Sequence, residues 1–261
     1  IISPLEFLSA ANDLKSIHEL EGLNVLLVSD EEIYNEFSGG IPDATAIKQF
    51  LRMFYVRENG NPNTIPKYCL LFGDGSYDNR NILVHNKNIL PIYQSSESLS
   101  IVNTYASDDY FAILGNGASM QNTDLLNIGI GRLVVTNLAE ANEMVQKIRN
   151  YIFEQDNSLN NLTCNNNSSN SIYGDWRNKV VMVSDDQDNN AYFYDVEIMS
   201  TKVKSNNPSA NVLKIHSDAY AQQLTSVGER IPDAENEINQ KIKDGALLVN
   251  YIGHGGETGW A

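Results

Sequence analysis

Apolar positions along the chain fall into short continuous runs and into longer segments with a helical period. The short runs are rich in β-branched residues and end in polar residues or glycine, which predicts buried strands. Between them apolar residues recur every three or four positions, as in Ile47, Leu51 and Phe54, which predicts amphipathic helices. The predicted strands are 23–29, 68–72, 128–133, 179–184, 212–215 and 246–251, and the predicted helices are 43–57, 138–153, 191–203 and 233–242.

The order of these elements indicates the fold class. Strand, helix and strand follow one another repeatedly, so we expect an α/β protein with mostly parallel sheets flanked by helices. A polar stretch rich in Asn and Ser at 157–171 interrupts the pattern, and such a composition is typical of a linker or surface loop. We therefore expect an N-terminal subdomain over 1–156 and a second subdomain over 172–261.

Composition and charge then narrow the classes of function. The 261 residues include 18 Lys and Arg against 33 Asp and Glu, a net charge of −15. Nucleic acid is not an expected partner, because binding phosphates requires stripes of basic residues. No apolar run of about 18 residues predicts a membrane span. The chain starts at Ile1 without a basic and apolar leader, so we expect a processed segment whose targeting information lies elsewhere.

The two cysteines, Cys69 and Cys164, offer no framework of disulfides and no zinc-binding spacing. Cys69 lies inside an apolar strand, where a small buried thiol is the common outcome. Cys164 lies in the Asn-rich stretch, without structural support around it. Neither position suggests a catalytic nucleophile.

A histidine surrounded by glycines follows the last predicted strand. The run 246–252 leads directly into Gly253, His254, Gly255 and Gly256, and the carboxyl ends of strands are where open α/β sheets collect their functional groups. Glycines let the backbone approach a substrate and leave an N–H free to donate. A plain tight turn explains the same pattern. The other histidines, at positions 18, 85 and 216, lack metal-ligand spacing, so no metal site is predicted.

Acidic residues lie at several other predicted strand ends. Asp185, Asp186 and Asp188 follow the strand 179–184, where they would support a histidine, form a solvated turn or cap the next helix. In the first half, the aspartates at strand ends would form either a calcium site or metal-free turns, and we favour turns. These are Asp74, Asp78, Asp108 and Asp109.

Several of these segments resemble the gingipain-type cysteine peptidases of family C25. Residues 250–260 are similar to the segment that carries the catalytic histidine of this family, and 70–74, 107–110 and 128–133 follow in the family's order. The resemblance implies a caspase-like α/β fold of two subdomains, the second incomplete at its C-terminus, and a Cys/His dyad. No cofactor is implied as required, and structural calcium is allowed.

The resemblance also implies roles for individual residues. His254 would be the acid/base and the Gly255 N–H an oxyanion donor, and Asp186 matches best the carboxylate that supports the histidine. Asp195 aligns loosely with an acidic specificity residue, and Glu257 and Trp260 follow the histidine in the family manner, near the substrate. The nucleophilic Cys of the family follows the histidine, so we expect it beyond Ala261 and expect no activity from these 261 residues alone.

Within the family, 73–78, 183–188 and 218–220 are most similar to the surface sortase of the bacterial type IX secretion system. This resemblance implies an enzyme at the bacterial cell surface that cleaves the C-terminal signal domain from secreted cargo and passes the cargo to a glycolipid. Its partners would be those signal domains and outer-membrane components of the secretion system. The alternatives are a secreted gingipain-like endopeptidase and a non-catalytic caspase-like module for binding or assembly.

Overall fold

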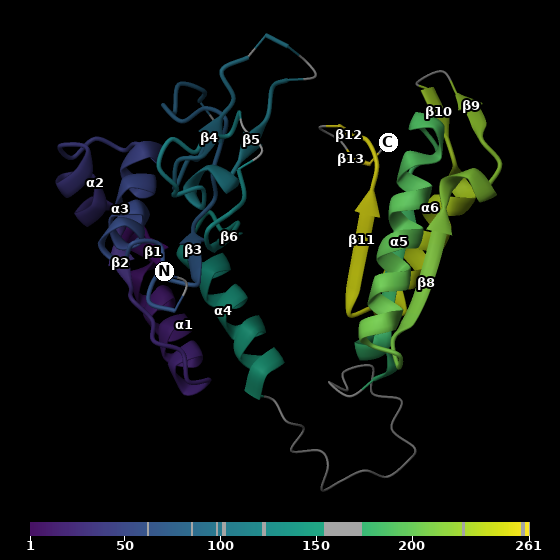
Figure 1. The fold of residues 1–261 in the computed structure, drawn as a ribbon, viewed down its shortest axis with the longest axis horizontal. Helices are drawn as coiled ribbons and strands as arrows, with labels where there is room; N and C mark the ends of the chain where they lie inside the picture. Colours follow the sequence, from purple (N-terminus) through teal and green to yellow (C-terminus); the bar gives the residue numbers. More distant parts are fainter. Residues whose placement is uncertain are drawn as a thin grey trace, which may run out of the picture. The chain divides into compact units, whose positions relative to one another are not determined.

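The chain divides into two compact units, 1–155 and 156–261, which we describe separately (Figure 1). A computed structural model describes residues 1–61, 63–84, 86–97, 99–100, 103–121, 124–153, 174–225, 228–256 and 259–260. The predicted linker at 157–171, with Cys164, lies outside these described residues. No helix among them is long and apolar enough to cross a membrane.

A parallel four-stranded sheet forms the centre of the first unit. Its strand order is β2-β1-β3-β6, where β1 is Ile2–Ser3, β2 Val28–Ser29, β3 Tyr68–Phe72 and β6 Gly129–Leu133. A short antiparallel pair, β4 (Tyr93–Gln94) and β5 (Ala106–Ser107), lies in the long β3–β6 connection, which also holds the single turn η2 (Asp109–Phe111).

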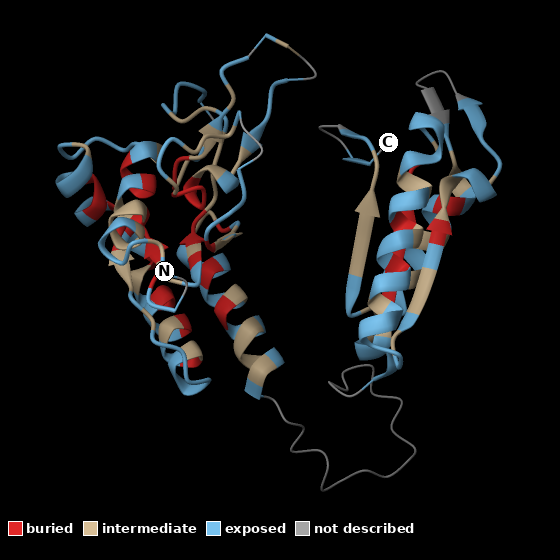
Figure 2. Cartoon of the chain, in the orientation of Figure 1, coloured by how far each residue is buried: buried red, intermediate tan, exposed pale blue. Residues whose placement is uncertain are grey.

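Helices cover both faces of this sheet. The helices are α1 (Leu8–Leu20), α2 (Asp30–Phe37), α3 (Ala44–Arg57) and α4 (Leu138–Phe153). Leu71 packs with side chains of α2 and α3, whereas its neighbour Phe72 packs with those of α1 and α4. Successive strand residues point to opposite faces, so the two clusters are the two sides of one sheet, and the buried positions line the inner helix faces (Figure 2).

Capping residues explain where two of these helices begin. Ser29 and Glu32 form a reciprocal capping box at α2, with Ser29 Oγ accepting from the Glu32 N–H and Glu32 Oε2 accepting from the Ser29 N–H at 2.9 Å. Asp43 caps α3 by accepting from the Thr45 N–H at 2.8 Å.

The second unit has a parallel three-stranded sheet in the order β11-β7-β8. The strands are β7 (Lys179–Ser184), β8 (Asn211–His216) and β11 (Leu248–Ile252), and the helices are α5 (Ala191–Asn206) and α6 (Pro232–Lys243). Two small antiparallel pairs complete it, β9 (Gln223–Thr225) with β10 (Gly228–Arg230), and β12 (Gly255–Gly256) with β13 (Gly259–Trp260).

The central strand β7 supplies the core on both sides of that sheet. Val180 and Met182 pack with Val196 of α5, whereas Val181 and Val183 pack with Ala234 of α6. Each helix therefore covers one face, and β7 is buried from Val180 onward because it has a strand on either side and a helix on either face.

The structure confirms the predicted α/β class with parallel sheets flanked by helices. The strands 68–72 and 179–184 and the helix 138–153 have the predicted bounds. The predicted strand 23–29 is wrong over most of its length, because only Val28–Ser29 pairs, whereas Leu23 and Leu26 are exposed. The helices α1 and α2 were not predicted, since two of the four buried residues of α1 are alanines and α2 follows β2 without a loop.

Candidate active site

Strand register places His254 beside the acidic residues that follow β7. In the parallel pair of β11 and β7, Ile252 lies opposite Ser184, so the residues after both strands leave the sheet at the same carboxyl edge. The Asp185 N–H donates to the Ile252 carbonyl at 3.0 Å and extends this pairing by one step. The two segments that the sequence singled out separately are therefore neighbours.

One carboxylate oxygen of Asp185 holds His254 at two points. Asp185 Oδ2 accepts from the His254 backbone N–H at 2.9 Å and lies 2.9 Å from Nδ1 of the imidazole. Burial acts to raise the pKa of Asp185, but the hydrogen bonds from the His254 backbone, from its ring and from the Asp186 N–H outweigh it and hold the pKa below its ordinary value. An ionised Asp185 assigns the proton to Nδ1, which leaves Nε2 as the nitrogen for proton transfer.

The carboxylate that contacts the His254 ring is thus that of Asp185 and not that of the predicted Asp186. Asp185 is the first residue beyond β7 and its side chain is 3% exposed, whereas the carboxylate of Asp186 accepts from the side chain of Gln222. Adjacent residues in extended backbone point in opposite directions, so only one of the two can face the histidine. Burial and the side chain of Asp185 raise the pKa of Asp186.

Gly253 is required where it stands, because the chain passes very close to Asp185. A Cβ at this position would overlap Asp185 Cβ and lie 2.5 Å from Tyr251 Oη. Tyr251 Oη donates to the His254 carbonyl at 2.7 Å, so the backbone is held on both sides of the histidine. Gly253 therefore has a steric reason within the fold, and the functional interpretation of the glycines stays a prediction.

Two of the remaining predicted residues, Gly255 and Trp260, lie in the small β12–β13 hairpin. Gly255 is paired with Trp260, and the Trp260 ring stacks on Tyr251 with centroids 4.5 Å apart. Trp260 is half exposed. Glu257 lies outside the described residues. Asp195 is exposed on α5, and its predicted contact with substrate stays a prediction.

On the Nε2 side of the ring lie Asp188, which the sequence offered as one of three candidate aspartates, and Tyr192, which sequence reasoning missed. Asp188 Oδ2 and Tyr192 Oη each lie 3.4 Å from His254 Nε2, and Tyr192 Oη donates to Asp188 Oδ2 at 2.8 Å. The Tyr192 and His254 rings meet edge to face with centroids 5.3 Å apart. The signal was the spacing of Asp188 and Tyr192, four residues apart at the start of a helix.

A second histidine lies at the end of β8 and has a structural environment. His216 Nδ1 is 2.7 Å from Ser184 Oγ, and Nε2 is 3.1 Å from Glu197 Oε1, which also pairs with Lys214. The ring packs on Phe193, and Ser184 is buried. Both ring nitrogens are thus engaged inside the unit, away from an accessible nucleophile.

Three of the four strand-end aspartates of the first unit accept hydrogen bonds from the protein itself. Asp108 forms a bidentate pair with Arg132, whose guanidinium also donates to three backbone carbonyls. Asp74 and Asp78 accept from backbone N–H groups of Gly75 and Leu83. Over the described ranges, no three His, Cys, Asp or Glu side chains converge as a metal site would require. Structural calcium therefore stays an expectation from the family resemblance, and we propose no calcium site there.

Cys69 does not meet the needs of a nucleophile. Its side chain is buried within β3, and burial raises the pKa of its thiol to about 11. The thiolate is the reactive form of cysteine, so the protonated Cys69 thiol is a poor nucleophile at neutral pH. It is the one cysteine within the described parts of the chain.

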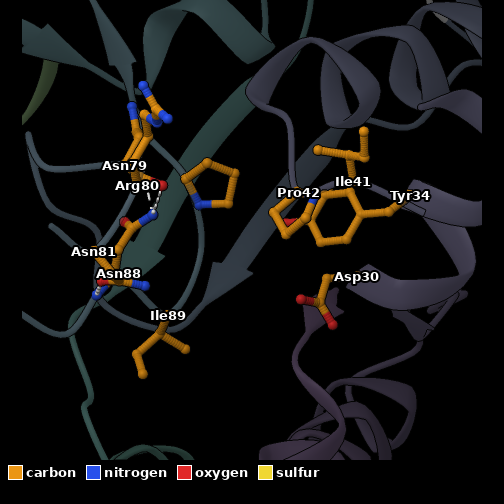
Figure 3. A pocket seen from close by; sticks show the side chains of 10 residues that line it. Asp30, Tyr34, Ile41, Pro42, Asn79, Arg80, Asn81, Asn88 and Ile89 are labelled. Carbon is orange, nitrogen blue, oxygen red and sulfur yellow. Dashed lines mark hydrogen bonds between the residues drawn. The ribbon is translucent and has the colours of Figure 1, made fainter. Parts of the chain in front are cut away.

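The first unit also holds a cleft of about 370 Å³ between the start of α2 and the 79–91 segment (Figure 3). Asp30 and Tyr34 line one side, and Arg80 with several asparagines lines the other. Asp30 Oδ1 and Tyr34 Oη are buried without a hydrogen-bond partner. Burial raises the pKa of Asp30 to about 6, so this carboxyl is held in the fold at a cost in stability.

Comparison with known proteins supplies the family. The family model of peptidase family C25 matches residues 1–261. Among solved structures, dimeric latent PorU from Porphyromonas gingivalis is 35% identical and matches with a TM-score of 0.49. That match covers 57% of this chain and 15% of the PorU chain, so the chain spans a small part of that protein. A search of curated proteins found no match. Because the family model extends over the whole sequence, the chain belongs to peptidase family C25, a family of cysteine peptidases.

Proposed function

We propose that the protein is a cysteine peptidase that acts through a Cys/His dyad, with His254 as its acid/base and Asp185 as the residue that positions it. The observation that carries this proposal is the contact of Asp185 Oδ2 with both the backbone N–H and Nδ1 of His254. This contact fixes the ring, assigns its proton and leaves Nε2 available, which is what general acid/base catalysis needs.

The proposed chemistry follows from these roles. Nε2 takes the proton of the nucleophilic thiol, and the thiolate attacks the peptide carbonyl carbon, whose π electrons move to the oxygen. The N–H of Gly255 is proposed to donate to that oxyanion. When the intermediate collapses, the C–N bond breaks and the imidazolium gives its proton to the leaving amine. A thioester then links the cargo to the enzyme.

The nucleophile is proposed to come from a part of the protein outside these 261 residues. Cys69 is excluded by its burial and by its raised thiol pKa. These 261 residues by themselves are therefore predicted to have no peptidase activity. Labelling the full-length protein with a thiol-reactive peptide probe, followed by mass spectrometry of the modified peptide, identifies the cysteine. Label on Cys69 or on Cys164, the two cysteines of this sequence, would contradict the assignment.

We further propose that the enzyme is a sortase of the bacterial type IX secretion system, located at the cell surface. It would recognise the C-terminal signal domain of secreted cargo, and outer-membrane secretion components would be its partners. The similarity of 73–78, 183–188 and 218–220 to the family's sortase supports this proposal. An amine of a surface glycolipid would attack the thioester carbonyl and lose a proton to His254 Nε2 as the thiolate leaves.

Two measurements test these proposals. In the full-length protein, His254→Ala is expected to abolish cargo processing, whereas His18→Gln on α1 leaves it unchanged; normal processing by the His254 variant would refute the dyad. Mass spectrometry of the processed cargo shows whether an amine or water accepted the acyl group. An added amine supports the sortase, and a free carboxylate from water indicates a secreted endopeptidase instead.

A further inference from the structure

The Nε2 side of His254 carries two groups that the dyad chemistry does not require. Asp188 Oδ2 and Tyr192 Oη both lie 3.4 Å from Nε2, and the tyrosine donates its proton to the aspartate at 2.8 Å. The hydrogen bond to Asp188 and burial raise the pKa of Tyr192, so its hydroxyl remains protonated. Through this hydrogen bond Tyr192 holds the Asp188 carboxylate beside the imidazole.

A strained backbone segment delivers Asp188 to this position. Asp188, Asn189 and Asn190 have φ angles of 57°, 52° and 64°, which is the left-handed region that disfavours L residues. Asp and Asn tolerate this region best after glycine, yet each such residue costs about 1 kcal/mol. Three in succession at the start of α5 form a turn that carries the Asp188 carboxylate toward the histidine. Strain of this kind collects at functional sites.

Acceptor oxygens face both nitrogens of the His254 ring. Asp185 faces Nδ1, and Asp188 and Tyr192 present only acceptor oxygens to Nε2. A neutral imidazole would direct a lone pair at these oxygens, whereas an imidazolium directs an N–H at them. The other titratable groups nearby are Asp186, Asp195 and Tyr251, and within the described residues no lysine or arginine forms an ion pair with Asp185 or Asp188.

We propose that Asp188 and Tyr192 act as positioning residues of His254, with Asp188 stabilising the imidazolium from the Nε2 side and Tyr192 holding Asp188 in place. This inference rests on the proposed function, in which the thiol proton moves to Nε2 and leaves a thiolate beside an imidazolium. The Asp188 carboxylate, 3.4 Å from Nε2, stabilises the imidazolium of this ion pair without itself taking a proton. Because 3.4 Å is longer than a normal hydrogen bond, Nε2 stays open to the sulfur.

The expected effect of removing the Asp188 charge is small, because both side chains of the pair are partly exposed to solvent. The His254 and Asp188 side chains are 45% and 57% exposed, so solvent screens their interaction to the level of a surface ion pair. Loss of the Asp188 charge destabilises the imidazolium, and the alkaline limb of the activity profile moves to lower pH. We expect a shift of about half a pH unit. A purely structural residue would lower the rate without moving this limb.

The test is the pH profile of cargo processing by the full-length protein. The variants are Asp188→Asn, Tyr192→Phe and the double variant, and the matched controls are Asp233→Asn on α6 and Tyr194→Phe, an exposed tyrosine of α5. Asp188→Asn is expected to shift the alkaline limb to lower pH by about half a pH unit. Tyr192→Phe is expected to shift the limb in the same direction, by no more than Asp188→Asn does. The double variant is expected to match Asp188→Asn, because Tyr192 acts through Asp188.

Each outcome decides the inference. An unmoved limb in Asp188→Asn would overturn it, as would a double variant whose shift is the sum of both single shifts. Hydrogen exchange of the β7 amides, followed by mass spectrometry, verifies that the second unit folds in the variants. Failure of the proposed function is distinguishable, since then His254→Ala itself would process cargo.

Discussion

Replacing Asp30 by Asn is expected to stabilise the first unit at neutral pH. Asp30 is 9% exposed at the first position of α2, and one of its carboxylate oxygens has no hydrogen-bond partner. Burial raises its pKa to about 6, from an ordinary value of 3.8. The ionised carboxylate is thus less favourable in the folded chain than in the unfolded chain, and Asn keeps the shape without the charge.

The magnitude follows from the difference between these two values. A difference of about two units corresponds to about 3 kcal/mol of destabilisation when the carboxylate is fully ionised. The favourable hydrogen bonds from the backbone N–H groups of Asp30 and Glu31 are already included in the pKa of about 6. Burial is the larger effect, so Asp30→Asn is expected to raise the free energy of unfolding by about 2–3 kcal/mol at pH 7.5.

The way in which the stability difference changes with pH follows from the raised pKa of Asp30. The folded-state pKa is raised, so the destabilisation is complete above about pH 6 and vanishes below the unfolded value of 3.8. The advantage of Asp30→Asn over the natural chain should therefore fall between pH 6 and pH 4. At pH 4 the two proteins are expected to agree within about 0.5 kcal/mol.

The assay must report on the first unit alone. Both tryptophans, Trp176 and Trp260, belong to the second unit, so their fluorescence serves as an internal control that should not change. Hydrogen exchange of the β3 amides, followed by mass spectrometry at pH 7.5 in increasing urea, measures the stability of the first unit. Glu31→Gln, at the exposed neighbouring position, is the matched variant and is expected to change stability by less than about 0.5 kcal/mol.

A lower stability of Asp30→Asn at pH 7.5 would refute this reasoning. It would show that the carboxylate has a stabilising partner in the cleft of Figure 3, and the pKa would then be depressed. An advantage that persists unchanged at pH 4 would equally contradict burial of charge as the cause.

Three further changes probe the sites described above. Gly253→Ala forces Asp185 and His254 apart, and should destabilise the second unit by about 1–3 kcal/mol in urea and abolish processing. Arg132→Lys keeps the charge but loses the bidentate pair with Asp108, and should destabilise the first unit by about 3 kcal/mol by hydrogen exchange. Asp185→Asn should lower the processing rate on the order of 10²-fold or more. It should also reduce the stability of the second unit at pH 7, because the pKa of Asp185 is depressed in the folded chain. This loss of stability should shrink as the pH falls through the range in which an aspartate takes up its proton.

These predictions have clear counter-results. Gly255→Ala, where an added Cβ meets only the Gly259 carbonyl at 3.7 Å, should leave the urea midpoint near that of the natural chain. An equal loss for the two glycine variants would show that space at Gly253 is not the cause. A first unit unaffected by Arg132→Lys would show that the fork geometry is not needed. Stability of Asp185→Asn independent of pH would contradict the depressed pKa.

The sequence by itself determined the class of fold and the neighbourhood of the site. Apolar runs at 68–72 and 179–184 and the periodic segment at 138–153 became elements with those bounds, because a strand or helix that buries a complete face shows its period locally. The glycine-flanked His254 was located at a strand end for the same reason. Short strands such as Val28–Ser29 have too few residues to show a period.

Only the tertiary structure decided which residues meet the histidine. Asp185 and Asp186 are equivalent in composition and differ by one position, and the pairing of Ile252 with Ser184 is what brings Asp185 to the ring. Tyr192 reaches His254 through a left-handed turn that no pattern of apolar residues reveals. Hydrophobic periodicity records which face of an element is buried, whereas contacts between side chains depend on register and on the path of the loops between elements.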